Sequence, residues 1–499
     1  MKKSLFLIAI CIAITLVFSC SRLFLDRTVK KDSEILSQAF QVTKNIEDPY
    51  NKAAAVESIA IVYSANGQYD KAFKIIKAIE DINVKAFALI RLSKQAWGGG
   101  QKDKALQILS HAYKVAKTID DAHLKDYTFA MIADEYAKFE QKDKAVEVLS
   151  QAYEVAQTIK DAHIKAHDYV IIAETYVKAG QKDKAGEILS QAYEVAKSIE
   201  DFYAKITALD MIAGVLAEDG QFEKASEVTQ SIDDVFTKAA APDRIADVYV
   251  ALGQYDQAIN SAKSIEGPYT RAFALARISR QTWEAGHKNK ALEMLYKAYE
   301  VAKTIEDSYS RSVALAKISF DYTEDGQYDK ALQIAESIEH NYNKAAAMEK
   351  VAGGYAEDGQ YDKALQIAES IESAFYKAAA LNEVAGGYTK AEQKDKASET
   401  LKYAFNVAIT IEVPYSKAVA LDRIAGSYAE AGLYDDALQV AATIEDPYNK
   451  STALYRITYW CVEDGQYDKA FQVAETIDDA FYKASALTKI AGKETLKMI

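Results

Sequence analysis

Three histidines have the side-chain type and the spacing that could hold a metal ion. His163 and His167 are four residues apart, so on a helix they share one face, and His123 lies 40 residues before His163. A simpler interpretation is that His123 and His163 fill a position that is aromatic in the rest of the chain. That position elsewhere holds Tyr50, Tyr203, Tyr269 and Tyr309. The sequence therefore predicts structural histidines, with no metal and no cofactor.

The sequence contains no other pattern that indicates catalysis. We find no glycine-rich phosphate loop, no nucleophile elbow and no metal-binding motif with strong spacing. The 73 acidic residues follow the repeat described below, which is typical of helix caps and solvated faces. We therefore expect a protein that is not an enzyme.

Cys20 is the candidate for a covalent modification. Two lysines precede an apolar run from Leu5 to Phe18, and its 14 residues are fewer than the roughly 20 that a membrane-spanning helix needs. The run ends in Val-Phe-Ser-Cys, which resembles the lipobox of bacterial lipoproteins, where the cysteine is lipidated and becomes the mature N-terminus. We expect a signal peptide at residues 1–19, then the lipidated cysteine and a short linker at 20–29. Ordinary cleavage near the end of the apolar run and an uncleaved anchor stay open as alternatives.

The elements that position all these residues are copies of one unit. Twelve times the chain contains Gly-Gln-Tyr-Asp-Lys-Ala or a close variant, for example from Gly67 to Ala72 and from Gly326 to Ala331. The copies are 33 or 40 residues apart, and self-similarity at this period is typical of a solenoid. Each unit contains a first helix, which ends before the glycine, and a second helix, which follows it. The seven extra residues of the longer units fall in the second helix and amount to nearly two turns.

Residues with special backbone roles mark the helix boundaries. Four of the five prolines fall at the first position of a first helix, and aspartates such as Asp48 stand at its N-cap. Pro242 falls inside a first helix and predicts a late start or a kink. Residues 31–47 match a lone second helix, and residues 480–497 match a lone first helix. The sequence thus predicts an all-α solenoid of about 26 antiparallel helices over residues 30–499, with half-repeat caps.

A lysine or arginine recurs in the first turn of every first helix. A cation there opposes the helix dipole, so its charge must be offset. We expect pairing across the turn with acids that end the preceding second helices, such as Glu47 and Glu80. A cationic stripe for an anionic ligand is the alternative. This basic column consists of Lys52, Lys85, Lys125, Lys165, Lys205, Lys238, Arg271, Arg311, Lys344, Lys377, Lys417, Lys450 and Lys483.

The repeat resembles the tetratricopeptide repeat family. The family pattern of large apolar, small, tyrosine, glycine, aromatic and alanine residues appears here as Val56, Ile59, Ala60, Tyr63, Gly67, Tyr69 and Ala72. Periods of 33 and 40 in place of 34, and the lack of a tryptophan at the first offset, are departures from that pattern. The resemblance implies a right-handed superhelix whose first helices line a concave groove. It implies that the groove binds peptides or partner proteins, without catalysis.

By this resemblance, the groove is lined by outward positions of the first helices that vary from repeat to repeat. Arginine and aromatic side chains are typical interface anchors, and packing between helices is the other interpretation of the tryptophans. The main candidates are Lys94, Trp97, Tyr127, His167, Glu174, Arg280, Trp283, Phe320, Tyr455 and Tyr459, and Asp210, Asp247 and Phe273 are further ones.

Charge and composition limit the class of partner. A net charge of −13 argues against a nucleic-acid partner, which favours a basic face. We expect an extracytoplasmic scaffold of the cell envelope, tethered to the membrane by its lipid anchor, whose groove binds a partner protein or peptide. A small-molecule or glycan-binding envelope protein is the alternative.

Overall fold

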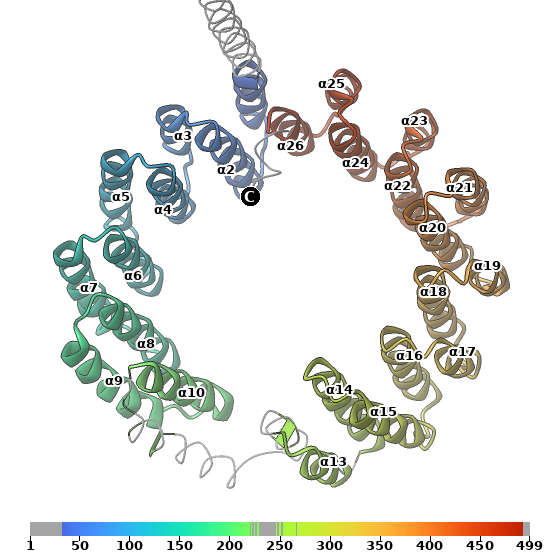
Figure 1. Ribbon diagram of the computed structural model, residues 1–499, viewed down its shortest axis with the longest axis horizontal. Coiled ribbons are helices and arrows are strands. Elements are labelled where there is room, and N and C mark those ends of the chain that lie inside the picture. The colour runs from blue at the N-terminus through green and yellow to red at the C-terminus, as the bar shows by residue number, and fades with distance from the viewer. Residues whose placement is uncertain are drawn as a thin grey trace, which may run out of the picture. The chain divides into compact units, whose positions relative to one another are not determined.

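The computed structural model describes residues 32–219, 253–265 and 267–492, together with a few separate positions between 221 and 250. Every regular element within these residues is a helix and none is a strand, which confirms the all-α prediction. The helices follow one another as pairs joined by short turns (Figure 1). The chain divides into two compact units, of which the first combines Met1–Val235 with Ala470–Ile499 and the second is Phe236–Lys469.

The first unit contains both kinds of helix that the repeat predicts. Its first helices are α2 (Pro49–Ala65), α4 (Ile82–Gly98), α6 (Ala122–Lys138), α8 (Ala162–Lys178), α10 (Phe202–Glu218) and the terminal α26 (Ala480–Ala491). Its second helices are the helical residues 32–43, α3 (Tyr69–Ile76), α5 (Lys102–Ala116), α7 (Lys142–Ala156) and α9 (Lys182–Lys197).

The second unit repeats the same alternation. Its first helices are α14 (Pro268–Glu284), α16 (Ser308–Glu324), α18 (Asn341–Glu357), α20 (Ala374–Lys390), α22 (Pro414–Glu430) and α24 (Pro447–Glu463). Its second helices are α13 (Tyr255–Lys263), α15 (Lys288–Ala302), α17 (Tyr328–Glu336), α19 (Tyr361–Ser370), α21 (Lys394–Ala408) and α23 (Tyr434–Ala442). The last second helix, α25 (Tyr467–Glu475), crosses the boundary between the two units.

The extra residues of the longer repeats lengthen the second helix, as predicted. The first helices α4 and α18 both have 17 residues, although they belong to repeats of different length. The second helix of a long repeat, such as α5, has 15 residues, whereas that of a short repeat, such as α17, has nine.

The predicted helix starts and stops are in place. Asp48 accepts a hydrogen bond from the backbone N–H of Asn51 (2.7 Å), which satisfies a donor that the helix leaves free. The prolines that open first helices are Pro49, Pro268, Pro414 and Pro447. After the first helix the chain turns through Gly67 with a φ of 71°, a conformation that suits glycine. Glu140 and Glu392 occupy this same turn in their own repeats, with φ of 61° and 58°.

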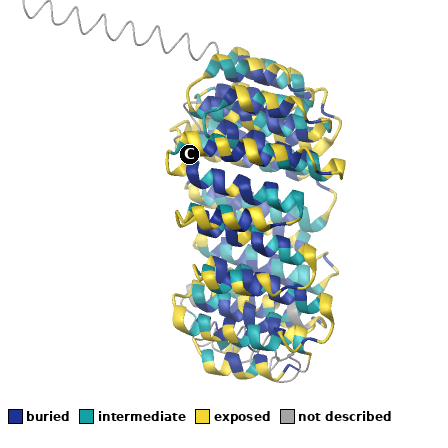
Figure 2. Ribbon diagram, turned by 90° about the vertical axis from the view of Figure 1, so that its right-hand side faces the viewer, coloured by how far each residue is buried: buried dark blue, intermediate teal, exposed yellow. Residues whose placement is uncertain are grey.

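Small residues allow the helices to approach one another closely. Figure 2 shows stacked helices with buried faces between them and exposed residues in the connecting turns. The alanine of the Gly-Gln phrase is fully buried in each described copy: Ala72, Ala105, Ala145, Ala185, Ala258, Ala291, Ala331, Ala364, Ala397, Ala437 and Ala470. Aromatic rings then fill the space between repeats. Tyr113 in a long repeat packs on Phe129 (ring centroids 5.6 Å apart), and Tyr361 in a short repeat packs on Tyr388 (4.2 Å).

The two half-repeats at the ends of the array pack against each other in the first unit. Within the described residues, the helix at 32–43 is the first second helix of the array and α26 is its last first helix. Ala484 of α26 is buried together with Ile46 and Ala55, and Phe481 packs against this cluster. Residues 32–43 and α26 therefore pack as the two helices of one composite repeat.

No helix among the described residues has both the length and the apolar character that a membrane crossing requires. Cys20 and the rest of residues 1–31 lie outside the described residues. Pro242, at which the sequence predicts a late helix start or a kink, also lies outside them.

Candidate functional site

A row of exposed tyrosines follows the first turns of the first helices in the second unit. Each one stands two residues before the basic column, so the same position is used in repeat after repeat. The side chains protrude strongly, since Tyr309, Tyr342 and Tyr415 are 60%, 64% and 71% exposed. The tyrosine row consists of Tyr269, Tyr309, Tyr342, Tyr415 and Tyr448. Repeated exposure of a large ring is unfavourable in water, and tyrosine is enriched at protein interfaces.

An open cleft lies beside the tyrosine row at the start of α18. Its volume is about 750 Å³, and Tyr342, Lys344 and Met348 line one wall while Ser370 and Glu372 line the other. The walls come from α18 and from the end of α19, so the cleft lies between neighbouring helices. The ring of Tyr342 contacts that of Tyr376 in the next repeat (centroids 5.3 Å apart), which holds it at the edge of the cleft.

Two members of the basic column are offset in a way that the sequence analysis did not predict. Arg271 and Arg311 each donate a hydrogen bond of 2.6 Å to the carbonyl of Ile265 or Ile305, at the end of the preceding second helix. These carbonyls lie just after the second helices α13 and α15 and accept directly from the cationic side chains. Pairing with an acid of the preceding second helix is confirmed at Lys483, which lies 3.4 Å from Glu475.

Elsewhere the pairing prediction fails or changes partner. Lys52 and Arg311 pair with Glu80 (3.7 Å) and Glu339 (2.9 Å), which follow the second helix of the same repeat. The prediction is wrong for a further set of lysines, which form no ion pair with the described residues: Lys85, Lys125, Lys165, Lys344, Lys377, Lys417 and Lys450. In the second unit, Lys344, Lys417 and Lys450 each follow a tyrosine of the row, whereas Lys377 follows Phe375.

The predicted groove residues fall into both units. Those in the first unit are Lys94, Trp97, Tyr127, His167 and Glu174, and those in the second are Arg280, Trp283, Phe320, Tyr455 and Tyr459. Lys94 and Tyr459 are exposed, whereas the other eight are half-buried. Asp247, one of the further candidates, lies outside the described residues.

Several of these candidates connect neighbouring repeats. Trp97 stacks on Phe139 (centroids 4.3 Å apart, planes at 10°) beneath the ammonium group of Lys102. The ammonium group of Lys288 covers Trp283 in the same way. The lysine nitrogen lies 4.8 Å from the ring centroid at Trp97 and 5.0 Å from it at Trp283. Both indoles therefore contact side chains of neighbouring helices, as the interpretation of the tryptophans as packing residues expects.

Polar candidates also form ion pairs within and between repeats. Glu174 pairs with Lys178 one turn further along α8 (2.7 Å). Arg280 of α14 pairs with Glu324 of α16, and Lys350 of α18 lies 3.6 Å from the same carboxylate. These contacts connect three consecutive first helices.

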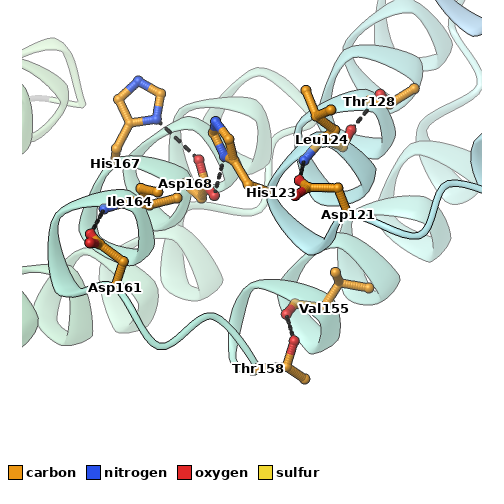
Figure 3. Close-up of polar contacts among 10 residues, drawn as sticks. All are labelled: Asp121, His123, Leu124, Thr128, Val155, Thr158, Asp161, Ile164, His167 and Asp168. Carbon is orange, nitrogen blue, oxygen red and sulfur yellow. Dashed lines mark hydrogen bonds and ion pairs between the residues drawn. The ribbon is translucent and has the colours of Figure 1, made fainter. Parts of the chain in front are cut away.

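His123 and His167 both contact one carboxylate. Figure 3 shows the two imidazoles, one on α6 and one on α8, directed at Asp168. The Nδ1 atoms of His123 and His167 lie 2.8 Å and 3.1 Å from the two carboxylate oxygens. His163, which shares the position of His123 one repeat later, is not part of this cluster.

Asp126 lies beside this pair and completes a group of possible metal ligands. One ligand atom each from His123, Asp126 and Asp168 lie within 4.8 Å of one another. Burial, together with the neighbouring Asp168 carboxylate, raises the pKa of Asp126 to about 9. Neither carboxyl oxygen of Asp126 makes a hydrogen bond of good geometry with the described residues.

Sequence reasoning identified two of these histidines but missed both aspartates and the exposure of the tyrosines. The usable signal was the repeat itself, because aspartate at these two positions breaks an alanine pattern that most other copies keep. The tyrosine position was noted only because His123 and His163 occupy it in their own repeats.

Comparisons with known proteins give weak similarities. No family model matches the chain, and no curated protein matches it. Among solved structures, Ton1535 from Thermococcus onnurineus NA1 is 20% identical with a TM-score of 0.31, over 65% of this chain and 97% of that one. A Podosopora anserina putative kinesin light chain with nearly identical TPR-like repeats is 20% identical with a TM-score of 0.21, over 44% and 95%. Yeast Tom70 is 14% identical with a TM-score of 0.25, over 83% and 96%. Similarities of this size say nothing about what this chain binds.

Proposed function

We propose that the chain is a scaffold of the extracytoplasmic cell envelope that binds a partner protein or peptide. The observation that supports this most directly is the tyrosine row of the second unit. A repeated, exposed aromatic position presents several anchors, and each anchor has a lysine or arginine two residues later. A partner segment that covers the row would bury several rings at once, which is how aromatic anchors contribute to binding.

The row gives the interaction a different location from the groove that the family resemblance implies. The earlier candidates Trp97 and Trp283 are half-buried and already covered by lysines. Four tyrosines of the row, Tyr309, Tyr342, Tyr415 and Tyr448, are at least 60% exposed and so keep most of their surface for a partner. We therefore propose that the partner binds along the row and enters the cleft beside Tyr342.

Alanine variants in the row test this proposal. Membranes of the native host should yield a partner on a wild-type bait, and Tyr342→Ala with Tyr415→Ala should reduce its recovery strongly. Tyr296 and Tyr403 provide a matched control, because they are exposed tyrosines (51% and 39%) on the second helices α15 and α21. Equal recovery with the row variant and the control variant would exclude the row as the binding surface.

The second part of the proposal is a lipid anchor at Cys20. The support is the charged, apolar and cysteine-terminated leader, which would hold the scaffold at a membrane surface. Metabolic labelling with a fatty acid should be lost in Cys20→Ser and retained in Cys461→Ser, whose thiol is buried. Labelling that persists in Cys20→Ser would rule the anchor out.

A small-molecule or glycan ligand is the second candidate function. The cleft of about 750 Å³ beside Tyr342 favours it, since ligand pockets are roughly 300–1,000 Å³ and a tyrosine face can stack on a sugar ring. This candidate predicts glycan binding that Tyr342→Ala removes and that needs no second tyrosine of the row. Binding that depends on Tyr309, Tyr342 and Tyr415 together would favour an extended partner.

A further inference from the structure

We propose that His123, Asp126 and Asp168 form a binding site for one divalent transition-metal ion, which joins α6 to α8. The three side chains come from two neighbouring first helices in the first unit. One potential ligand atom from each lies within 4.8 Å of the others. Small side-chain rotations are enough to bring such atoms to the roughly 2.0–2.2 Å at which imidazole and carboxylate ligands hold zinc.

The repeat provides an internal comparison for both aspartates. In the position of Asp126, the other copies include Ala53, Ala86, Ala166, Ala272, Ala345, Ala378, Ala418 and Ala484. In the position of Asp168, they include Ala55, Ala88, Ala208, Ala274, Ala314, Ala347, Ala380, Ala420, Ala453 and Ala486. Alanine is therefore the usual residue at both positions. The two acids depart from this pattern in adjacent repeats, where they face each other.

No cation among the described residues pairs with Asp126. Its side chain is completely buried, and neither carboxyl oxygen has a well-formed hydrogen bond. Its nearest charged neighbour is another carboxylate, Asp168, which is itself 2% exposed. Buried carboxylates normally pair with a cation or coordinate a metal, because an uncompensated buried charge is costly. No lysine or arginine among the described residues forms an ion pair with either acid.

The donor set indicates the class of ion. Two carboxylates with an imidazole suit zinc, manganese or iron better than magnesium or calcium, which prefer oxygen ligands alone. His167 lies on the other side of Asp168, with its Nδ1 3.1 Å from Oδ1. It can therefore orient the Asp168 carboxylate, as residues behind a metal ligand often do. His123 is 39% exposed, which gives an ion access from solvent.

Binding of zinc to the full-length chain, without a polyhistidine tag and after chelator treatment, tests the site. Isothermal titration should detect one zinc ion per chain. Asp126→Ala and Asp168→Ala should each weaken zinc binding by at least about tenfold. Both substitutions restore the residue that the repeat prefers, so the variants should keep the helical circular dichroism of the wild type. Zinc should raise the unfolding temperature of the wild type and leave that of the double variant unchanged, because binding stabilises only a folded site.

His163 gives the matched control. It occupies the position of His123 in the next repeat, where the positions of the two acids hold Ala166 and Ala208. His163→Ala should therefore leave zinc affinity unchanged, while His123→Ala should reduce it. The proposal is overturned if zinc does not bind in a saturable way, or if either aspartate variant binds it as tightly as the wild type. Magnesium binding as tight as zinc binding would also overturn it, since imidazole would then not be a ligand.

Discussion

The amide of Gln38 donates a hydrogen bond of 2.7 Å to the carboxylate of Glu475, 437 residues further along the chain. This contact joins residues 32–43 to the end of α25, and Ala484 of α26 packs with Ile46 and Ala55, so the two ends of the array meet within the first unit. Half-repeats at the end of a solenoid expose the apolar face that a neighbour would cover. In this chain the two ends pack on each other, so each end covers apolar surface of the other.

A charge inserted into the composite repeat should loosen the start of the array. Ala484→Glu places a carboxylate among Ile46, Ala55 and Phe481, and an unpaired buried charge is strongly unfavourable. Backbone amides of residues 32–65 should then exchange with deuterium at least about tenfold faster. Gln472→Glu, on the exposed side of α25, is the control and should not change this exchange. Unchanged exchange in Ala484→Glu would mean that the two ends do not pair in solution.

Glycine at position 392 should stabilise the protein. Glu392 has a φ of 58° in a turn where other repeats use glycine, such as Gly359 with 78°. Because a side chain in this conformation costs roughly 1–2 kcal/mol, Glu392→Gly should raise the free energy of unfolding by about 1 kcal/mol. Urea unfolding can measure this, and Gly359→Glu should show the opposite sign. A loss of stability in Glu392→Gly would contradict the assignment of this turn.

Two glycines within helices, Gly354 and Gly386, test how closely neighbouring helices pack. A Cβ atom on Gly354 would lie 2.6 Å from Cγ2 of Thr323 and 2.7 Å from Cε1 of Tyr328, whereas one on Gly386 meets no atom within 4 Å. Gly354→Ala should therefore destabilise the protein by about 1–3 kcal/mol through overpacking. Gly386→Ala should stabilise it by about 0.5–1 kcal/mol, because alanine favours the helix. Equal effects of the two substitutions would show that α16 and α18 do not approach as closely as described.

Asp325 should give the second unit a characteristic pH dependence. Burial, assisted by the Asp321 carboxylate, raises the pKa of Asp325 to about 6, from 3.8 in the unperturbed group. Since the folded chain holds this proton more tightly, the stabilising contribution is complete below about pH 4 and is lost as the pH rises through about 6. Asp325→Asn should therefore lose less stability than the wild type between these pH values, as measured by urea unfolding.

Asp307 is the control for that measurement, because its pKa shifts the other way. The backbone N–H of Ser310 hydrogen-bonds to Asp307 and lowers the pKa of its carboxyl group. Its contribution is therefore complete above the unfolded pKa and is lost only as the pH falls below it. Asp307→Asn should leave the slope between pH 4 and pH 6 unchanged. An identical slope in Asp325→Asn and the wild type would contradict the burial of Asp325.

Most of the fold could be predicted from the sequence because one unit is written out many times. The positions of Asp48, Pro49 and Gly67 specify where a helix begins and ends, and every copy repeats that information. The pairing of the two half-repeats could not be predicted, since Ala55 and Ala484 carry the same apolar surface as every other copy. The residues of a terminal helix therefore do not indicate whether it packs against the other end of the array.

The candidate sites depend on contacts between repeats, which a single copy does not encode. His123 reaches Asp168 across 45 residues only because α6 and α8 stack side by side. The partner of Arg271 in the basic column was missed for a related reason. The carbonyl of Ile265 that compensates Arg271 is a backbone atom, so no residue type in the sequence reveals it.

The most direct test of the scaffold proposal is site-specific crosslinking in membranes of the native host. A photo-crosslinking amino acid in place of Tyr309, Tyr342 or Tyr415 should give one adduct of the same partner from all three positions, because they belong to one row. The same amino acid in place of Tyr296 or Tyr403, which lie on second helices, should give no such adduct. Adducts of equal yield from both sets of positions, or no adduct from the row, would contradict the account.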